Sequence, residues 1–306
     1  MIKVFIDGAE GTTGLVIRDR LKEYSGIEVL SLPEEVRKDA TARKEIMNKS
    51  DLVFLCLPDV AAKEAVTFVT NPKTIIIDTS TAHRTNEEWD YGFPELTGQK
   101  EKIKNSKRIA NPGCHASGFI ALVAPLIESG VIDENVALSA FSITGYTGGG
   151  KKMIAEYEGD CPQLYNAPRQ YGVSQAHKHI PEMIKICNLQ TKPTFCPIVS
   201  NFPRGMEVTI PISKKDINAS VEKVKQIYRD YYTSSIVFFN ENADENGFLS
   251  ANKFANKDSL EISVFGNDEN MILVARFDNL GKGASGAAIQ NMNLVLGFDE
   301  EKGLSL

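Results

Sequence analysis

Residues 3–21 read KVFIDGAEGTTGLVIRDRL, a short β-forming run followed by a glycine-rich turn and a segment with helical spacing. Strand, glycine turn and helix in this order form the site that binds the pyrophosphate of a dinucleotide. Gly8 permits the tight turn, Gly11 lets N–H groups approach the phosphates, and Gly14 lets the helix lie against the strand. We predict that five residues of this segment bind the cofactor: Gly8, Gly11, Thr12, Thr13 and Gly14. Because the spacing is G-x-x-G-x-x-G, a purely structural glycine turn is the alternative.

The second predicted strand, residues 27–32, bears on the choice of cofactor. In NAD-specific folds an acidic residue usually ends this strand and holds the ribose 2′-hydroxyl. Here the strand reaches Ser31, and the cations Arg37 and Lys38 follow. A small hydroxyl with nearby cations suits the 2′-phosphate, so the sequence favours NADP(H). A solvated charged helix is the alternative, because two glutamates precede these cations.

Two further apolar runs extend this pattern. Residues 50–58 and 74–78 are continuous strands of the kind that parallel sheets bury on both faces. With the intervening helices they predict a doubly wound parallel sheet, an α/β Rossmann domain, whose ligands bind outside the carboxyl ends of the strands. We expect the residues at these ends to surround one crevice. They are Leu57 and Pro58 for the cofactor, and Ser80, His83, Arg84 and Asn111 for the substrate.

The second half of the chain has a different pattern of strands and helices. Its strand-like runs lie at residues 136–144, 194–199, 205–211, 260–264 and 271–278, with one long helix at 219–232. Strands that do not alternate strictly with helices predict an antiparallel sheet with helices on one face, an α+β domain. A last helix, at 283–296, begins with small residues that suit close packing on a cofactor or on another helix.

Composition narrows the class of protein. The 306 residues are 42% hydrophobic and 24% charged, with a net charge of -6 that gives no reason to expect nucleic-acid binding. Five scattered cysteines without Cys-x-x-Cys spacing suggest reduced thiols rather than disulfides or a zinc site. No apolar run approaches the roughly 20 residues of a membrane span, and the N-terminus does not resemble a signal peptide. We therefore expect a cytoplasmic protein without membrane partners.

Residues 111–118 read NPGCHASG and place Cys114 at the end of a tight turn, directly before the apolar helical segment 119–126. A thiol at a helix N-terminus lies close to the positive end of the helix dipole and to unpaired N–H groups. Both lower its pKa from about 8.5 towards neutrality and favour the nucleophilic thiolate. An ordinary buried cysteine is the alternative.

A histidine pair lies in residues 177–182, which read HKHIPE. In an extended segment His177 and His179 would point to opposite sides, so that one reaches a reaction centre and the other is held structurally. Glu182 could orient either imidazole, as the third member of a nucleophile–base–orienter series. No third ligand has a recognisable spacing, so we predict no metal site, and a polar surface pair is the alternative.

Together, an NADP fold and a thiolate restrict the chemistry. Cysteine adds to an aldehyde or displaces phosphate from an acyl phosphate, the nicotinamide exchanges hydride with that carbon, and a histidine moves the proton. Cations are needed to hold a carboxylate or phosphate of the substrate, and Arg84, Arg169, Lys151 and Lys152 are available. Each could equally be an ordinary surface charge.

Six motifs carry a family resemblance that covers essentially the whole chain. They are DGAEGTTG (7–14), FLCLP (54–58), DTSTAHR (78–84), NPGC (111–114), HKHIPE (177–182) and NLGKGASG (279–286). By these motifs the chain resembles the shorter type of the N-acetyl-gamma-glutamyl-phosphate reductase family, NADP-dependent enzymes of arginine biosynthesis. Relatives such as aspartate-semialdehyde dehydrogenase share the cysteine motif, whereas the combination of motifs is more specific. The family frequently has His-Arg-His where this chain has Lys178 between its histidines.

The resemblance implies reduction of N-acetyl-L-glutamyl 5-phosphate to the 5-semialdehyde and phosphate, with NADPH as cofactor and through a Cys114 thioester. It implies acid–base catalysis by His177, with His179 tied to Glu182. The implied domains are an NADP-binding domain (1–114, with a helix 285–306 returning to it) and a semialdehyde dehydrogenase-like catalytic and oligomerisation domain (115–284). We expect a homodimer or homotetramer. The candidate set is completed by Gly283, Ala284 and Asn291 for the cofactor and by Tyr146 and Lys151 for the substrate.

Two alternatives remain open. A related reductase acting on aspartyl phosphate, or on a substrate of lysine synthesis, would keep the same thiolate chemistry. A non-catalytic NADP sensor would be expected to lose the nucleophile or its histidine partner, and both are present here.

Overall fold

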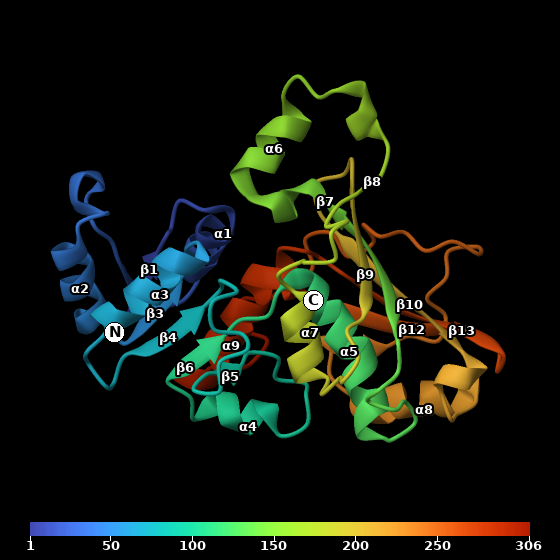
Figure 1. Ribbon diagram of the computed structural model, residues 1–306. Helices are drawn as coiled ribbons and strands as arrows, with labels where there is room; N and C mark the ends of the chain where they lie inside the picture. Colours follow the sequence, from blue (N-terminus) through green and yellow to red (C-terminus); the bar gives the residue numbers. More distant parts are fainter. The chain divides into compact units, whose positions relative to one another are not determined.

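The computed structural model describes all residues from 1 to 306, and the chain folds into two compact units (Figure 1). Unit 1 comprises Met1–Gly113 and Ala284–Leu304, and unit 2 comprises Cys114–Gly283 and Ser305–Leu306. The predicted domain boundaries differ from these by one residue at each of the two points where the chain passes from one unit to the other. The prediction assigned Cys114 to the first domain and Ala284 to the second.

Unit 1 contains a six-stranded sheet in the order β2-β1-β3-β4-β6-β5, and every neighbouring pair is parallel. The strands are β1 (Ile2–Asp7), β2 (Ile27–Leu30), β3 (Leu52–Leu55), β4 (Ile75–Asp78), β5 (Asp90–Tyr91) and β6 (Arg108–Ala110). The predicted doubly wound parallel sheet is therefore confirmed. Sequence periodicity did not reveal β5 and β6, because two or three residues are too few to show a repeat.

Helices cover both faces of this sheet. They are α1 (Thr12–Leu21), α2 (Ala40–Lys49), α3 (Asp59–Phe68), α4 (Gln99–Lys104), α9 (Gly286–Leu296) and the 3₁₀ turn η1 (Glu34–Val36). Val4 and Ile6 of β1 belong to the core formed with α1 and α9, whereas Phe5 belongs to the core formed with α2 and α3. This alternation explains why the strands read as continuous apolar runs.

The C-terminal helix α9 ends at Leu296, as the pattern at residues 283–296 predicted, and does not continue to residue 306 as the domain prediction expected. It ends there because Gly297 adopts the left-handed conformation, φ 73°, that stops a helix. Residues 297–304 then return along unit 1, where the Tyr24 hydroxyl donates a hydrogen bond to the carbonyl of Lys302.

Unit 2 contains a seven-stranded sheet in the order β11-β12-β13-β10-β7-β9-β8. The strands are β7 (Ser139–Gly145), β8 (Arg169–Gln170), β9 (Thr194–Ser200), β10 (Met206–Ser213), β11 (Val237–Phe239), β12 (Leu260–Gly266) and β13 (Asn270–Phe277). The prediction of an antiparallel sheet was wrong in two places, because β7 and β9 pair in parallel, as do β11 and β12. Long connections allow these parallel pairings, because two helices lie between β7 and β9, and residues 240–259 separate β11 from β12. The helix α8 (Val221–Tyr231) precedes β11.

Three helices of unit 2, α5 (Cys114–Glu128), α7 (Ile180–Ile186) and α8, form a layer on one face of the sheet, as expected, whereas α6 (Gly150–Glu158) lies apart from this layer and packs on the short turn η2 (Tyr146–Gly149) (Figure 1). Unit 2 also contains the short turns η3 (Gln163–Asn166) and η4 (Lys214–Asp216), and a π-helical turn, η5 (Gly281–Ser285), at the return to unit 1. α5 lies at the centre of this layer and is buried from His115 to Leu126. Two tyrosines of the α8 segment fix it, since the hydroxyls of Tyr228 and Tyr232 donate to carbonyls of Leu122 and Ala121.

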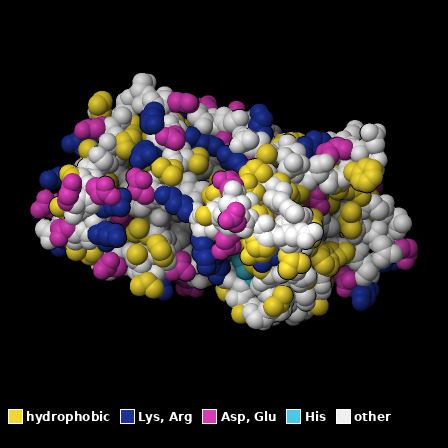
Figure 2. Space-filling view, turned by 90° about the horizontal axis from the view of Figure 1, so that it is seen from above, with side chains coloured by type: hydrophobic (Ala, Val, Ile, Leu, Met, Phe, Trp, Pro, Cys, Tyr) yellow, Lys and Arg dark blue, Asp and Glu magenta, His cyan; other side chains and the backbone are white.

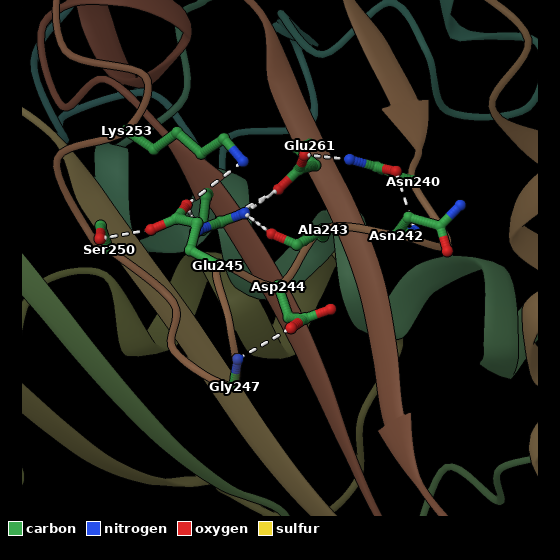
Figure 3. Close-up of polar contacts among 10 residues, drawn as sticks. Asn240, Asn242, Ala243, Asp244, Glu245, Gly247, Ser250, Lys253 and Glu261 are labelled. Atoms are coloured by element: carbon green, nitrogen blue, oxygen red, sulfur yellow. Dashed lines mark hydrogen bonds and ion pairs between the residues drawn. The ribbon is translucent and has the colours of Figure 1, made fainter.

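The opposite face of this sheet is open, and β10 alternates buried with more exposed residues along its length. An ionic cluster covers one end of the open face, where the loop after β11 folds back (Figure 3). Arg276, fully buried on β13, donates to Glu261 at 2.6 Å, to Glu245 at 2.7 Å and to the carbonyl of Ala243 at 2.6 Å. The buried guanidinium thus ties the loop to β12 and β13.

On the face shown in Figure 2, Lys and Arg side chains are interspersed with Asp and Glu, and little histidine surface is visible. The latter agrees with the burial of three of the four histidines, His83, His115 and His179. None of the helices is both long and apolar enough to cross a membrane.

Candidate active site

Cys114 is the first residue of α5 and is partly exposed, so the thiol lies at the N-terminus of a 15-residue helix as the sequence indicated. Three residues connect it to the end of β6 in the chain. Gly283 of the π-helical turn packs directly against it, because a Cβ on Gly283 would lie 2.9 Å from the Cβ of Cys114. The absence of a side chain at position 283 therefore keeps the region around the thiol clear.

His177 and His179 lie together rather than on opposite sides. Their ring centroids are 4.8 Å apart with the planes at 85°, so the expectation based on an extended segment was wrong. The physical reason is a turn, in which Ile180 N–H donates to the His177 carbonyl and His179 adopts helical angles as the N-cap of α7. Glu182 is buried in the first turn of α7, and its tie to His179 stays a prediction.

The environment of His177 favours its neutral form. Burial, followed by the positive charge of Lys178, lowers the pKa of His177 to about 4. Its ring lies edge-on to Phe195 at 5.2 Å. At neutral pH this imidazole is unprotonated and can accept a proton, which is the state that a general base requires.

Sequence reasoning missed one group of side chains beside these histidines. Nδ1 of His115 lies 2.6 Å from the Ser142 hydroxyl, and its Nε2 lies 2.6 Å from the Tyr171 hydroxyl. Burial lowers the pKa of His115 to about 3, with smaller effects of His177 and Lys178. Burial also raises the pKa of Tyr171, and negative charge on Cys114 raises it further. No spacing rule connects these residues, because Ser142 and Tyr171 are 27 and 56 residues from His115.

In unit 1 the glycine turn has the close contacts that a pyrophosphate site needs. Gly8 has φ 87°, and a Cβ there would lie 2.3 Å from the carbonyl oxygen of Cys56, while one on Gly14 would lie 2.5 Å from the carbonyl oxygen of Gly8. Gly11 is the N-cap of α1, whose first residues are Thr12 and Thr13. The hydroxyl of Thr12 is buried without a hydrogen-bond partner, so it can accept or donate to a phosphate oxygen.

A pocket of about 480 Å³ adjoins this turn in unit 1. It is lined by Gly8, Leu57, Ser31 and the cations Arg18, Arg37 and Lys38. Arg37 also pairs with Glu34 at 3.2 Å on the surface. Arg43 lines the pocket as well, but its guanidinium is engaged with the buried carboxylate of Asp7 at 2.7 Å. Pro58 forms the N-cap of α3, next to Leu57.

The candidate substrate residues of unit 1 are buried in a network at the end of β4. Asp78 accepts from Ser80 at 2.7 Å and lies 2.6 Å from Nδ1 of His83, whose ring stacks on Trp89. Arg84 donates to the carbonyls of Thr79 and Asn111, both at 2.9 Å. These contacts give the side chains a scaffolding role in unit 1, and their contact with substrate stays a prediction.

Asn111 and Asn291 connect the returning helix to the sheet. The amide of Asn111 donates to the carbonyl of Ala284 at 3.0 Å, and the amide of Asn291 donates to Asn111 Oδ1 at 3.1 Å. In unit 2, Tyr146 stacks on Tyr157 at 4.9 Å and donates to Glu158, while Lys151 is exposed on α6. The ligand-binding roles of these residues also stay predictions.

Both halves of the chain match known proteins of one kind. Residues 114–279 match the family described as semialdehyde dehydrogenase, dimerisation domain, and residues 31–106 match semialdehyde dehydrogenase, NAD binding domain. The chain is 44% identical to N-acetyl-gamma-glutamyl-phosphate reductase of Brucella suis, over 96% of this chain and 99% of that one. It is 42% identical to the proteins of that name from Sinorhizobium medicae (96% and 98%) and, with the suffix 2, from Nostoc sp. (99% and 99%).

Among solved structures, aspartate semialdehyde dehydrogenase II of Vibrio cholerae, complexed with ASA, has the same fold. It aligns with a TM-score of 0.73 at 16% identity, covering 97% of this chain and 98% of that one. The Candida albicans aspartate semialdehyde dehydrogenase with NADP aligns with a TM-score of 0.70 at 15% identity, with the same coverage. Both confirm the Rossmann domain with a second α/β domain.

Proposed function

The chain belongs to the N-acetyl-gamma-glutamyl-phosphate reductase family, and we propose from this premise how its residues carry out the reaction. It is an oxidoreductase of arginine biosynthesis that reduces N-acetyl-L-glutamyl 5-phosphate to the 5-semialdehyde with NADPH and releases phosphate. The observation that carries the assignment of residues is a thiol at the start of a buried helix, in the same unit as a neutral, partly buried His177.

Cys114 is the nucleophile in this proposal. His177 accepts the thiol proton, and the sulfur attacks the acyl carbon of the substrate. A C–S bond forms, the C–O bond to phosphate breaks, and protonated His177 gives its proton to the departing phosphate. NADPH, when bound, supplies the hydride that reduces the thioester carbon. The C–S bond then breaks as the aldehyde carbonyl forms, which releases the Cys114 thiolate, and a proton from solvent restores the thiol.

Unit 1 is proposed as the NADP-binding domain. The close-packed turn at Gly8, Gly11 and Gly14 and the buried, unpartnered hydroxyl of Thr12 fit a pyrophosphate at the N-terminus of α1. Ser31, Arg37 and Lys38, which line the adjoining pocket, would hold the 2′-phosphate. We expect Arg37→Ala to raise KM for NADPH while leaving KM for NADH unchanged. Lys22→Ala, which removes a surface ion pair with Asp19, is the matched control.

The experiment that tests the nucleophile runs the reaction in reverse, with N-acetyl-glutamate semialdehyde and NADP⁺ in the presence or absence of phosphate. Wild type is expected to form NADPH only with phosphate, Cys114→Ser to be inactive, and Cys196→Ser, which alters the open face of the sheet, to keep its rate. Activity in Cys114→Ser would remove the thiol from the mechanism. Turnover of aspartate semialdehyde in place of the N-acetyl substrate would support the aspartyl-phosphate alternative.

We also propose a homodimer that buries the open face of the unit 2 sheet. Side chains of Phe141, Ile198, Pro211 and Ile272 point to this face, and Phe141 is 45% exposed. Exposed apolar side chains on a sheet face favour a self-complementary, two-fold interface. Phe141→Asp should yield a smaller species in light scattering, whereas Phe248→Asp, at an exposed aromatic in the loop after β11, should not. A dimeric Phe141→Asp would place the interface elsewhere.

The five free cysteines and the net charge of -6 support a cytoplasmic location without nucleic-acid partners. Fractionation of cells that carry the native gene would test the location, and recovery of the protein with the membrane fraction would contradict it.

A further inference from the structure

His115, Ser142 and Tyr171 form a line of hydrogen bonds that the mechanism above does not use. His115 follows the nucleophile in α5 and is 2% exposed. Its two ring nitrogens each lie 2.6 Å from a hydroxyl, that of Ser142 on β7 and that of Tyr171 after β8. Buried hydrogen-bonded chains of this kind have a defined direction, because each hydrogen serves only one bond.

The count of hydrogens leaves two arrangements. A neutral imidazole has one N–H, and each hydroxyl has one O–H, so two bonds use two of the three hydrogens. In the first arrangement Ser142 donates to Nδ1, Nε2–H donates to Tyr171, and the Tyr171 hydrogen is left over. In the second, Tyr171 donates to Nε2, Nδ1–H donates to Ser142, and the Ser142 hydrogen is left over.

Burial decides between these arrangements. Ser142 is fully buried on the face of β7 that packs against the helices, and its hydroxyl contacts no acceptor other than His115. The second arrangement would therefore leave the buried Ser142 hydroxyl hydrogen without an acceptor. The full free energy of removing that donor from water would then be lost. The first leaves over the hydrogen of Tyr171, which is only partly buried and can meet a ligand or water.

The location of Tyr171 indicates what it would meet. Its ring centroid is 5.8 Å from that of His177, and its hydroxyl lies 2.6 Å from Nε2 of His115, the residue that follows Cys114 in α5. We propose that neutral His115, protonated on Nε2, holds Tyr171 as a hydrogen-bond donor to the carbonyl oxygen of the acyl group on Cys114. This inference rests on the proposed function, and makes Tyr171 a further catalytic residue and His115 a positioning residue.

The chemical consequence is stabilisation of the oxyanion. When phosphate is displaced, and again when the thioester is reduced, negative charge develops on the acyl oxygen. A neutral phenol donates a hydrogen bond to that oxygen without transferring its proton, so the balance of the reaction is unchanged. Removal of one such donor typically lowers kcat by about 10²-fold.

The tautomer of His115 is directly measurable. In protein labelled with ¹⁵N-histidine, with the signals assigned by comparison with His115→Gln, we expect a protonated-type shift at Nε2 and an unprotonated-type shift at Nδ1. A proton on Nδ1 would overturn the proposal. This measurement needs no substrate, so it remains decisive even if wild type lacks the proposed activity.

Kinetics supply the second test. Tyr171→Phe should lower kcat by about 10²-fold while leaving the rate of Cys114 alkylation by iodoacetamide unchanged, because the thiol itself is intact. His115→Gln, which keeps a donor at the position of Nε2, should retain more of kcat than His115→Met. An unchanged kcat in Tyr171→Phe would overturn the role of the phenol, and equal loss of alkylation would show a structural effect on the thiol instead.

Discussion

Acid should destabilise unit 2 through His115. The pKa of this buried imidazole falls from an ordinary 6.5 to about 3, so the folded protein binds the proton more weakly than the unfolded chain does. Below pH 6.5 the unfolded state therefore gains protons that the folded state lacks, and stability falls with pH until about pH 3. Between pH 7.5 and pH 5 these two pKa values imply a loss of about 2 kcal/mol.

A comparison with His115→Gln isolates this contribution. Glutamine keeps a hydrogen-bonding side chain but does not titrate, and other groups, including His177, cancel to first order between the two proteins. The assay is urea unfolding at pH 5.0 to 7.5, read by hydrogen exchange in peptides that cover α5. As the pH falls from 7.5 to 5.0, wild type should lose about 2 kcal/mol of unfolding free energy relative to the variant.

A difference that stays constant across this range would refute the reasoning. It would mean that His115 titrates equally in the folded and unfolded states, and the burial and hydrogen bonds described for it would then not hold its neutral form.

Three further predictions concern packing and charge. Gly283→Ala places a Cβ 2.9 Å from Cys114 Cβ and should slow alkylation of Cys114 by about tenfold or more, and an unchanged rate would contradict the tight contact. Gly14→Ala places a Cβ 2.5 Å from the Gly8 carbonyl and should weaken NADPH binding by about tenfold, as measured by nucleotide fluorescence. Glu261→Ala leaves the fully buried Arg276 without its nearest carboxylate and should cost about 3–5 kcal/mol in urea unfolding (Figure 3). The matched variant Lys253→Ala removes a partly exposed ion pair to Glu245 and should cost less than about 1 kcal/mol; equal costs would show that burial of Arg276 does not matter.

Local features of the sequence predicted unit 1 well. The strand, glycine turn and helix at residues 3–21 have a period and a glycine pattern that few other structures satisfy, and β1, Gly8 and α1 form as expected. The same holds for Cys114 at the start of α5, because turn residues and an apolar run are both local signals.

Errors arose where long-range pairing or a single turn decides the outcome. Whether β7 pairs with β9 in parallel depends on the path of the chain between them, and no residue in either strand encodes it. A turn at His177 brings two histidines together that an extended segment would separate. Gly297, one residue with positive φ, ends the last helix at Leu296, whereas the domain prediction continued that helix to residue 306.

The sequence by itself determined the strand, glycine turn and helix of residues 3–21 and the position of Cys114 at the start of α5, because each depends on residues that are adjacent in the chain. Only the tertiary structure brought the hydroxyls of Ser142 and Tyr171 to the two ring nitrogens of His115 and buried the His115 side chain. Those three residues come from α5, β7 and the segment after β8, and hydrogen bonds between side chains so distant in sequence leave no periodic trace in it. Burial, which fixes the neutral state of His115 and the direction of its hydrogen bonds, is a property of the packed unit rather than of any stretch of the chain.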